Sequence, residues 1–196
     1  PTAGPGPWPR AFHRFAAAAG LATAGLVTFG LISFHASRLG VLPLAAVPVV
    51  YAAAMAAGAV AALGSGWLFD RWHARVLYAL PVLGAAVPAL AFATVPAAIV
   101  AGALLWGAAT GVQDSTVKAL VADLVPAPRR ATAYGVFAAV QGVAALGGGA
   151  LAGALYERSR TALIVVFAVL QLLALILLAR TVAGRSRELS DQPASL

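Results

Sequence analysis

The sequence contains no cysteine, and it has only six Asp and Glu against 13 Lys and Arg. The absence of cysteine excludes disulfides, thiolate metal ligands and a cysteine nucleophile. Charged residues make up 10% of the 196 residues, whereas a soluble domain carries about 25%. So few charges cannot cover a surface that faces water, and much of the chain must therefore face lipid.

Long apolar runs make up most of the sequence. Hydrophobic residues account for 62% of the chain, and the mean hydropathy is +0.92. A helix needs about 20 mainly apolar residues to cross a bilayer, and barrel strands alternate instead. Six runs qualify as transmembrane helices: 15–36, 41–69, 76–94, 97–121, 132–156 and 161–179. The predicted fold is an all-α membrane protein, with a six-helix domain over residues 15–180, a linker over 1–14 and a tail over 181–196.

The basic residues predict the orientation in the membrane, since Lys and Arg concentrate on the cytoplasmic side. One side would hold Arg10, Arg14, Arg71, Arg75, Lys118, Arg129, Arg130, Arg180, Arg185 and Arg187, and the other only Arg38, Arg158 and Arg160. We therefore expect a multi-pass protein of the cytoplasmic membrane with both termini in the cytoplasm. The net charge of +7 does not indicate a nucleic-acid partner, because no stripe of basic and aromatic residues is present.

Two charged segments carry a family resemblance. The pattern Gly66-x-x-x-Asp70-Arg71-x-x-x-Arg75 follows the second run and resembles the loop signature of the major facilitator superfamily. Two positions depart from that signature, because His73 replaces a glycine and Ala74 replaces an arginine. The stretch from Asp123 to Gly135, with Pro126, Arg129 and Arg130, is similar to the passage between the fourth and fifth helices of the family's C-terminal half.

The resemblance implies a secondary transporter that works by alternating access, with a small solute bound between two six-helix halves. Six runs behind a Pro/Gly-rich linker resemble the C-terminal half, so the implied partners are the missing N-terminal half or a second copy, the bilayer and the solute. In the family, the acid of the loop motif latches the two halves together. For Asp70 the alternative is an ordinary loop residue that caps a helix, and we expect it to lack a strong partner in this chain alone.

Asp114 and Lys118 lie four residues apart near the end of the fourth run, so they share one helix face. An ionisable residue inside a membrane span is costly, which makes Asp114 the candidate for proton or cation coupling. The alternative is a structural ion pair that lets Lys118 reach the interface.

Polar and aromatic residues also recur on single helix faces. Trp106, Thr110 and Gln113 share a face with Asp114, and Tyr134 and Gln141 share one on the fifth run. By analogy with the family these faces line the cavity, with Tyr51 as a weaker candidate on the second run. Contact between helices remains the alternative for each residue. The small number of polar groups favours an apolar or amphipathic, drug-like solute.

Four glycines form small-x-x-x-small pairs that let helices pack closely: Gly107 with Gly111, and Gly149 with Gly153. No catalytic triad, phosphate loop or metal-ligand spacing can be assembled, and the three histidines are scattered, so we expect neither an enzyme nor a cofactor. Two other functions remain open. One is a six-span module that binds or scaffolds another membrane protein, and the other is a half-size transporter that acts as a homodimer.

Overall fold

The computed structural model describes residues 10–190, and within this range it leaves out the side chains of residues 10, 123, 124 and 184–190. The described residues form helices joined by short turns, and they contain no strand. Its elements follow in this order: α1 Arg10–Ala24, α2 Phe29–Arg38, the 3-10 turn η1 Leu44–Ala46, α3 Val47–Trp72, the 3-10 turn η2 His73–Tyr78, α4 Ala79–Ala91, α5 Pro96–Leu124, η3 Ala127–Arg129, α6 Arg130–Arg158 and α7 Arg160–Ser190. The prediction of an all-helical fold is confirmed.

The first apolar run is divided into two helices, although the sequence predicts one continuous span. α1 ends at Ala24, and the backbone is not helical again until α2 begins at Phe29. The N–H of Leu26 donates to the carbonyl of Thr23, so it does not bond to Ala22 as a continuing helix requires. The hydroxyl oxygen of Thr28 accepts from the N–H of Leu31 and caps α2.

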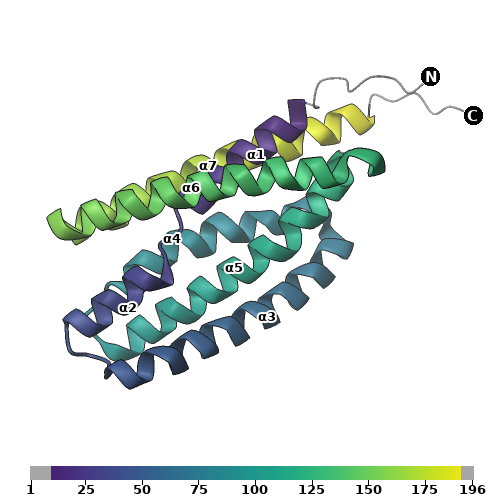
Figure 1. The fold of residues 1–196 in the computed structure, drawn as a ribbon. Coiled ribbons are helices and arrows are strands. Elements are labelled where there is room, and N and C mark those ends of the chain that lie inside the picture. The colour runs from purple at the N-terminus through teal and green to yellow at the C-terminus, as the bar shows by residue number, and fades with distance from the viewer. Residues whose placement is uncertain (1–9, 191–196) are drawn as a thin grey trace, which may run out of the picture.

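The helices pack as two layers that share their long direction (Figure 1). One layer contains α3, α4 and α5, and the other contains α1, α6 and α7. The two layers meet mainly at α4 and α7. α1 begins and α7 ends at the same end of the bundle, which we call the near end, and it also contains η2 and η3. The far end contains the turns after α2, α4 and α6.

Five stretches are long and apolar enough to cross a membrane, so the predicted number of six is not confirmed. The difference lies in one stretch, Leu44–Ala91, which contains both α3 and α4 and the turn η2 between them. α4 has only 13 residues, with Pro88 inside it, and is shorter than a span requires. Six spans therefore stay a prediction, which holds if η2 and α4 cross the membrane together.

The boundaries at the two ends also differ from the expected ones. α1 begins at Arg10, inside the predicted linker 1–14, and α7 continues to Ser190, inside the predicted tail 181–196. The remaining parts of the linker and the tail lie outside the described residues.

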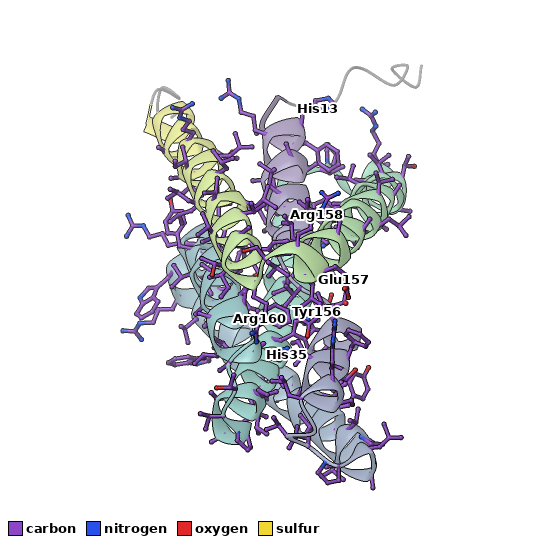
Figure 2. All side chains as sticks on the ribbon, turned by 90° about the vertical axis from the view of Figure 1, so that its left-hand side faces the viewer. His13, His35, Tyr156, Glu157, Arg158 and Arg160 are labelled. Carbon is purple, nitrogen blue, oxygen red and sulfur yellow. The ribbon has the colours of Figure 1, made fainter. Side chains whose placement is uncertain are left out.

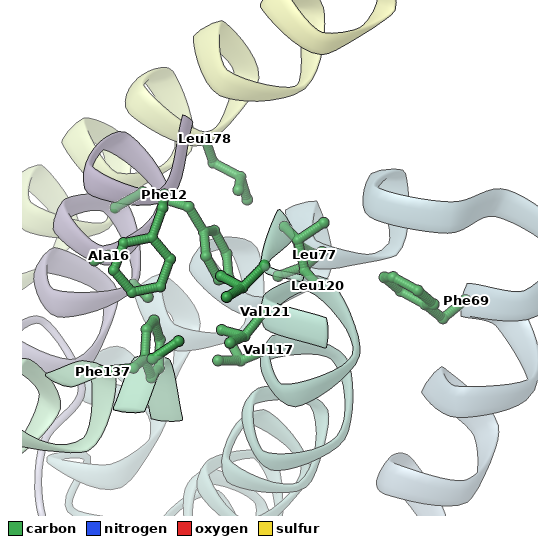
Figure 3. Packing of buried hydrophobic residues seen from close by; sticks show 14 residues of the cluster. Phe12, Ala16, Phe69, Leu77, Val117, Leu120, Val121, Phe137 and Leu178 are labelled. Atoms are coloured by element: carbon green, nitrogen blue, oxygen red, sulfur yellow. The ribbon is translucent and has the colours of Figure 1, made fainter. Parts of the chain in front are cut away.

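A cluster of buried apolar side chains holds the near end together. It brings Phe12 and Phe15 of α1 against residues of α5, α6 and α7 (Figure 3). The rings of Phe15 and Phe137 are stacked, with centroids 5.6 Å apart. A second cluster at the far end includes Ile32, Val87 and Phe167. The two clusters anchor opposite ends of the first run, on either side of its break.

Candidate functional site

The loop motif forms the turn between α3 and α4 at the near end. Gly66 lies six residues before the end of α3, where a Cβ atom would come within 3.3 Å of the Ser115 hydroxyl on α5. Asp70, Arg71 and Arg75 are all exposed. Among the described residues, no hydrogen bond or ion pair to Asp70 is formed. The carboxylate is therefore free to meet a group from outside these residues.

His73, the residue that replaces the motif glycine, has a backbone conformation that only glycine adopts readily. Its φ is 49° and its ψ is −140°, and it is the one non-glycine residue with a positive φ in the described range. This conformation ends α3 and starts the turn η2. The family's preference for glycine at this position therefore has a direct backbone explanation.

Asp114 and Lys118 are both exposed on α5, which fits their predicted place on one face. The ion pair that the alternative requires is not formed, since Arg38 and Glu157 make the one ion pair found among the described side chains. The hydroxyl of Tyr134 donates to the backbone carbonyl of Lys118 at 3.1 Å. Tyr134 thus links α6 to α5 close to the candidate coupling residues.

Two of the predicted cavity residues lie together in an aromatic cluster of Phe29, Tyr51 and Trp106. The ring of Phe29 is 4.9 Å from that of Tyr51 and 5.6 Å from that of Trp106, measured between centroids. The three residues come from α2, α3 and α5, and Tyr51 is 44% exposed. The cluster offers an accessible aromatic surface, and Phe29 was not among the predicted residues.

The other polar candidates are Thr110, Gln113 and Gln141, and they differ in whether their side chains form hydrogen bonds to described residues. The hydroxyl of Thr110 donates to the carbonyl of Trp106 in its own helix at 2.9 Å. The side-chain amide of Gln113 donates to the hydroxyl of Thr23 on α1 at 3.1 Å, while its Oε1 is buried and has no partner in the described part of the chain. Gln141 is half-buried on α6, where no hydrogen bond to another described residue involves its side chain.

The predicted packing glycines fall into two groups. Gly107 and Gly111 lie directly against the backbone of α3, at Ala54 and Gly58, where a Cβ atom would overlap the facing carbonyl groups. A Cβ atom on Gly149 would meet only the methyl group of Thr28, at 3.9 Å, and one on Gly153 would meet open space. On α6 the close approach is made by Gly148, which faces the carbonyl of Ala24 at the end of α1.

Two buried polar residues that bond to distant parts of the chain, His35 and Gln171, were not among the sequence-predicted sites. His35 of α2 is fully buried and lies within hydrogen-bond distance of the Tyr156 hydroxyl and the Ala93 carbonyl. Gln171 of α7 is 1% exposed and donates to the Ala22 carbonyl at 3.0 Å. A lone polar residue in an apolar run was the only signal in the sequence, because the partners are 149 residues away for Gln171 and 121 for His35.

Comparison with known proteins identifies the family. The family model described as Major Facilitator Superfamily matches residues 15–195. The chain therefore belongs to the major facilitator superfamily, whose members are membrane transporters and not enzymes.

Curated relatives are uncharacterised proteins of Mycobacterium bovis and of two strains of Mycobacterium tuberculosis. Each is 50% identical to this chain over 116 residues. The match covers 59% of this chain and only 28% of each relative, so the chain corresponds to a part of these longer proteins.

Proposed function

We propose that the chain forms one six-helix half of a secondary transporter that moves a small solute across the cytoplasmic membrane by alternating access. The observation that carries this proposal is the family match over residues 15–195. The near end would face the cytoplasm, because Arg14, Arg71, Arg75, Lys118 and Arg180 lie toward that end. Arg38 ends α2 at the far end, and the only other described Lys or Arg residues there are Arg158 and Arg160, which Figure 2 labels.

The uneven burial of the helices supports a second half. Inside the chain, 50% of the apolar window in the first stretch and 44% of that in α5 are buried. The corresponding values are 11% for the stretch that contains α3 and α4, and 17% for that of α6. α3 and α6 thus present broad apolar faces, which lipid or another six-helix half can cover.

The solute would meet the aromatic cluster of Phe29, Tyr51 and Trp106 on one part of α5 and Asp114 two turns further along. Aromatic faces favour flat apolar groups and cations, and the carboxylate adds a negative charge. This combination supports an apolar or amphipathic solute. In the proposed mechanism, Asp114 exchanges the coupling proton or cation, while Asp70 meets the other half.

The experiment is a flux assay with the full-length protein in vesicles, comparing Asp114→Asn with the unchanged protein. Removal of the carboxylate should reduce accumulation of the solute to passive equilibration, while exchange without a gradient persists. Glu157→Gln is the matched control, because it removes an exposed carboxylate at the far end. Gradient-driven accumulation that is unchanged in Asp114→Asn would eliminate the coupling role.

The same broad faces of α3 and α6 also suit the runner-up functions. In a scaffold, they would hold another membrane protein, and no solute would move. In a half-size transporter, a second copy of this chain would cover them. Flux without any further polypeptide would favour the homodimer, whereas absence of flux together with stable capture of a defined membrane partner would favour the scaffold.

A further inference from the structure

α2 is a helix of only ten residues, and non-helical backbone flanks it on both sides. Residues 25–28 separate it from α1, and residues 39–43 separate it from η1. The second connection contains Gly40, with a φ of 65°. A helix of ten residues between two such connections can move as one unit if the contacts between its side chains and the other helices break.

Polar side chains hold the chain on each side of the break. Upstream, the Gln171 amide of α7 bonds to the Ala22 carbonyl, which the break leaves without its helical donor. A Cβ atom on Gly84 would come within 2.8 Å of the Gln171 amide carbon, so α4 packs against this amide. The end of α1 is therefore tied to α7, and the break is a point about which α2 can turn.

Downstream, His35 ties α2 to two other elements at the far end (Figure 2). Its Nε2 lies 2.9 Å from the carbonyl oxygen of Ala93, just after α4, and its Nδ1 lies 2.8 Å from the hydroxyl of Tyr156 on α6. The carbonyl oxygen can only accept, so Nε2 carries a hydrogen and donates it. In the neutral imidazole, Nδ1 then accepts from the Tyr156 hydroxyl.

At the same end of α2, Arg38 makes two exposed contacts beside the buried hydrogen bonds of His35. Arg38 lies 6.0 Å from the centre of the Tyr156 ring and forms an ion pair with Glu157 at 3.1 Å. Both members of this pair are more than half exposed, so the pair contributes little by itself. The buried hydrogen bonds of His35 therefore determine how firmly the end of α2 is held.

From this arrangement we infer that His35 and Tyr156 form a clasp that holds α2 as a hinged segment. When the clasp opens, α2 turns about residues 25–28 and carries Phe29 away from Tyr51 and Trp106. His35 is then a positioning residue, which acts on the aromatic cluster through α2. This motion is local to one half and goes beyond the proposed function, because it needs neither the identity of the solute nor a second half.

The test measures how fast a buried cysteine on α2 reacts with a water-soluble maleimide in the full-length protein in detergent micelles. This chain contains no cysteine, so Ala36→Cys provides a single reporter here once any cysteine elsewhere in the protein has been replaced. Ala36 is 1% exposed and follows His35 directly. Ala91→Cys is the matched control, because Ala91 is fully buried near the same end but belongs to α4.

Tyr156→Phe removes the hydroxyl and keeps the ring against Phe34 and Phe92. Loss of one hydrogen bond should raise the open population, and with it the reaction rate of Cys at position 36, by about fivefold to tenfold. The rate of Cys at position 91 should stay unchanged. A rate at position 36 that changes less than twofold, or an equal rise at both positions, would overturn the clasp.

Two substitutions of His35 each keep one of its two hydrogen bonds and remove the other. His35→Asn places an amide near the position of Nδ1, where it can accept from Tyr156, whereas His35→Gln places one near Nε2, where it can donate to Ala93. If the clasp acts through the Tyr156 bond, adding Tyr156→Phe to His35→Gln should have no further effect on the rate at position 36. A full additive effect in that double variant would contradict the assigned bond.

Discussion

The conformation of His73 leads to a prediction that sequence and structure support separately. Its φ of 49° and ψ of −140° lie in a region that side chains with a Cβ atom avoid. Such a residue stores about 1–3 kcal/mol of strain, which glycine does not incur. Glycine also makes the unfolded chain more flexible, which costs about 0.5–1 kcal/mol. His73→Gly should therefore stabilise the folded protein by about 1 kcal/mol.

The other contacts of His73 subtract little from this gain. The residue is exposed, and its ring meets only the edge of Phe69 at a centroid distance of 6.5 Å. For a protein of 150–250 residues, a gain of 1 kcal/mol raises the melting temperature by about 2–4 °C. Thermal unfolding of the purified protein in detergent, followed by tryptophan fluorescence, would measure this shift.

Two neighbouring variants serve as controls. Ala74→Gly adds the flexibility of glycine at a residue without a positive φ, so it should lower the free energy of unfolding by up to about 1 kcal/mol. His73→Ala keeps the Cβ atom and hence the strain, so it should not reproduce the gain. If His73→Gly lowers the melting temperature as much as Ala74→Gly does, the assignment of strain to His73 is refuted.

Two further predictions concern packing inside the bundle. Gly107→Val would place a branched side chain against the backbone of α3 at Ala54 and should lower the melting temperature by several degrees, whereas Gly142→Val on α6 has open space and should change it little. Gln171→Met should lower the free energy of unfolding by about 1–2 kcal/mol, because the Ala22 carbonyl loses its donor, while Leu172→Met at an exposed neighbour should stay within 0.5 kcal/mol in denaturant titrations. Equal effects of the two members of either pair would show that the contacts described here do not determine stability.

The sequence predicts the helical class well, because hydropathy over about 20 residues is a strong signal. It does not reveal the break at residues 25–28, since the residues on both sides are apolar and only Gly25 hints at an interruption. It also does not reveal that the third run is divided between the 3-10 turn η2 and the 13-residue α4. Prolines inside apolar segments are tolerated in membrane helices, so Pro88 does not mark α4 as short. The backbone conformation at His73 ends α3, and hydropathy does not report it.

For the candidate site, sequence spacing predicts which residues share a face but not which side chains meet. Asp114 and Lys118 are both exposed on α5, as their spacing of four indicates, yet no ion pair forms between them. Tyr51 and Trp106 come together because α3 packs closely against α5, and α2, which follows the break, adds the ring of Phe29 to both. The contact between His35 and Tyr156 joins residues 121 positions apart, and no local pattern reports such a distance.

The packing of α1 has a consequence for how the protein is made. α1 is synthesised before the other described helices, but its principal neighbours α6 and α7 are the last of them to leave the ribosome. Until Phe137 emerges, the ring of Phe15 has no stacking partner and must rest against lipid acyl chains or an insertion factor. Membrane insertion of the first segment and its assembly with the others are thus separate events, and a nascent chain that stops before α6 leaves this segment unassembled in the bilayer.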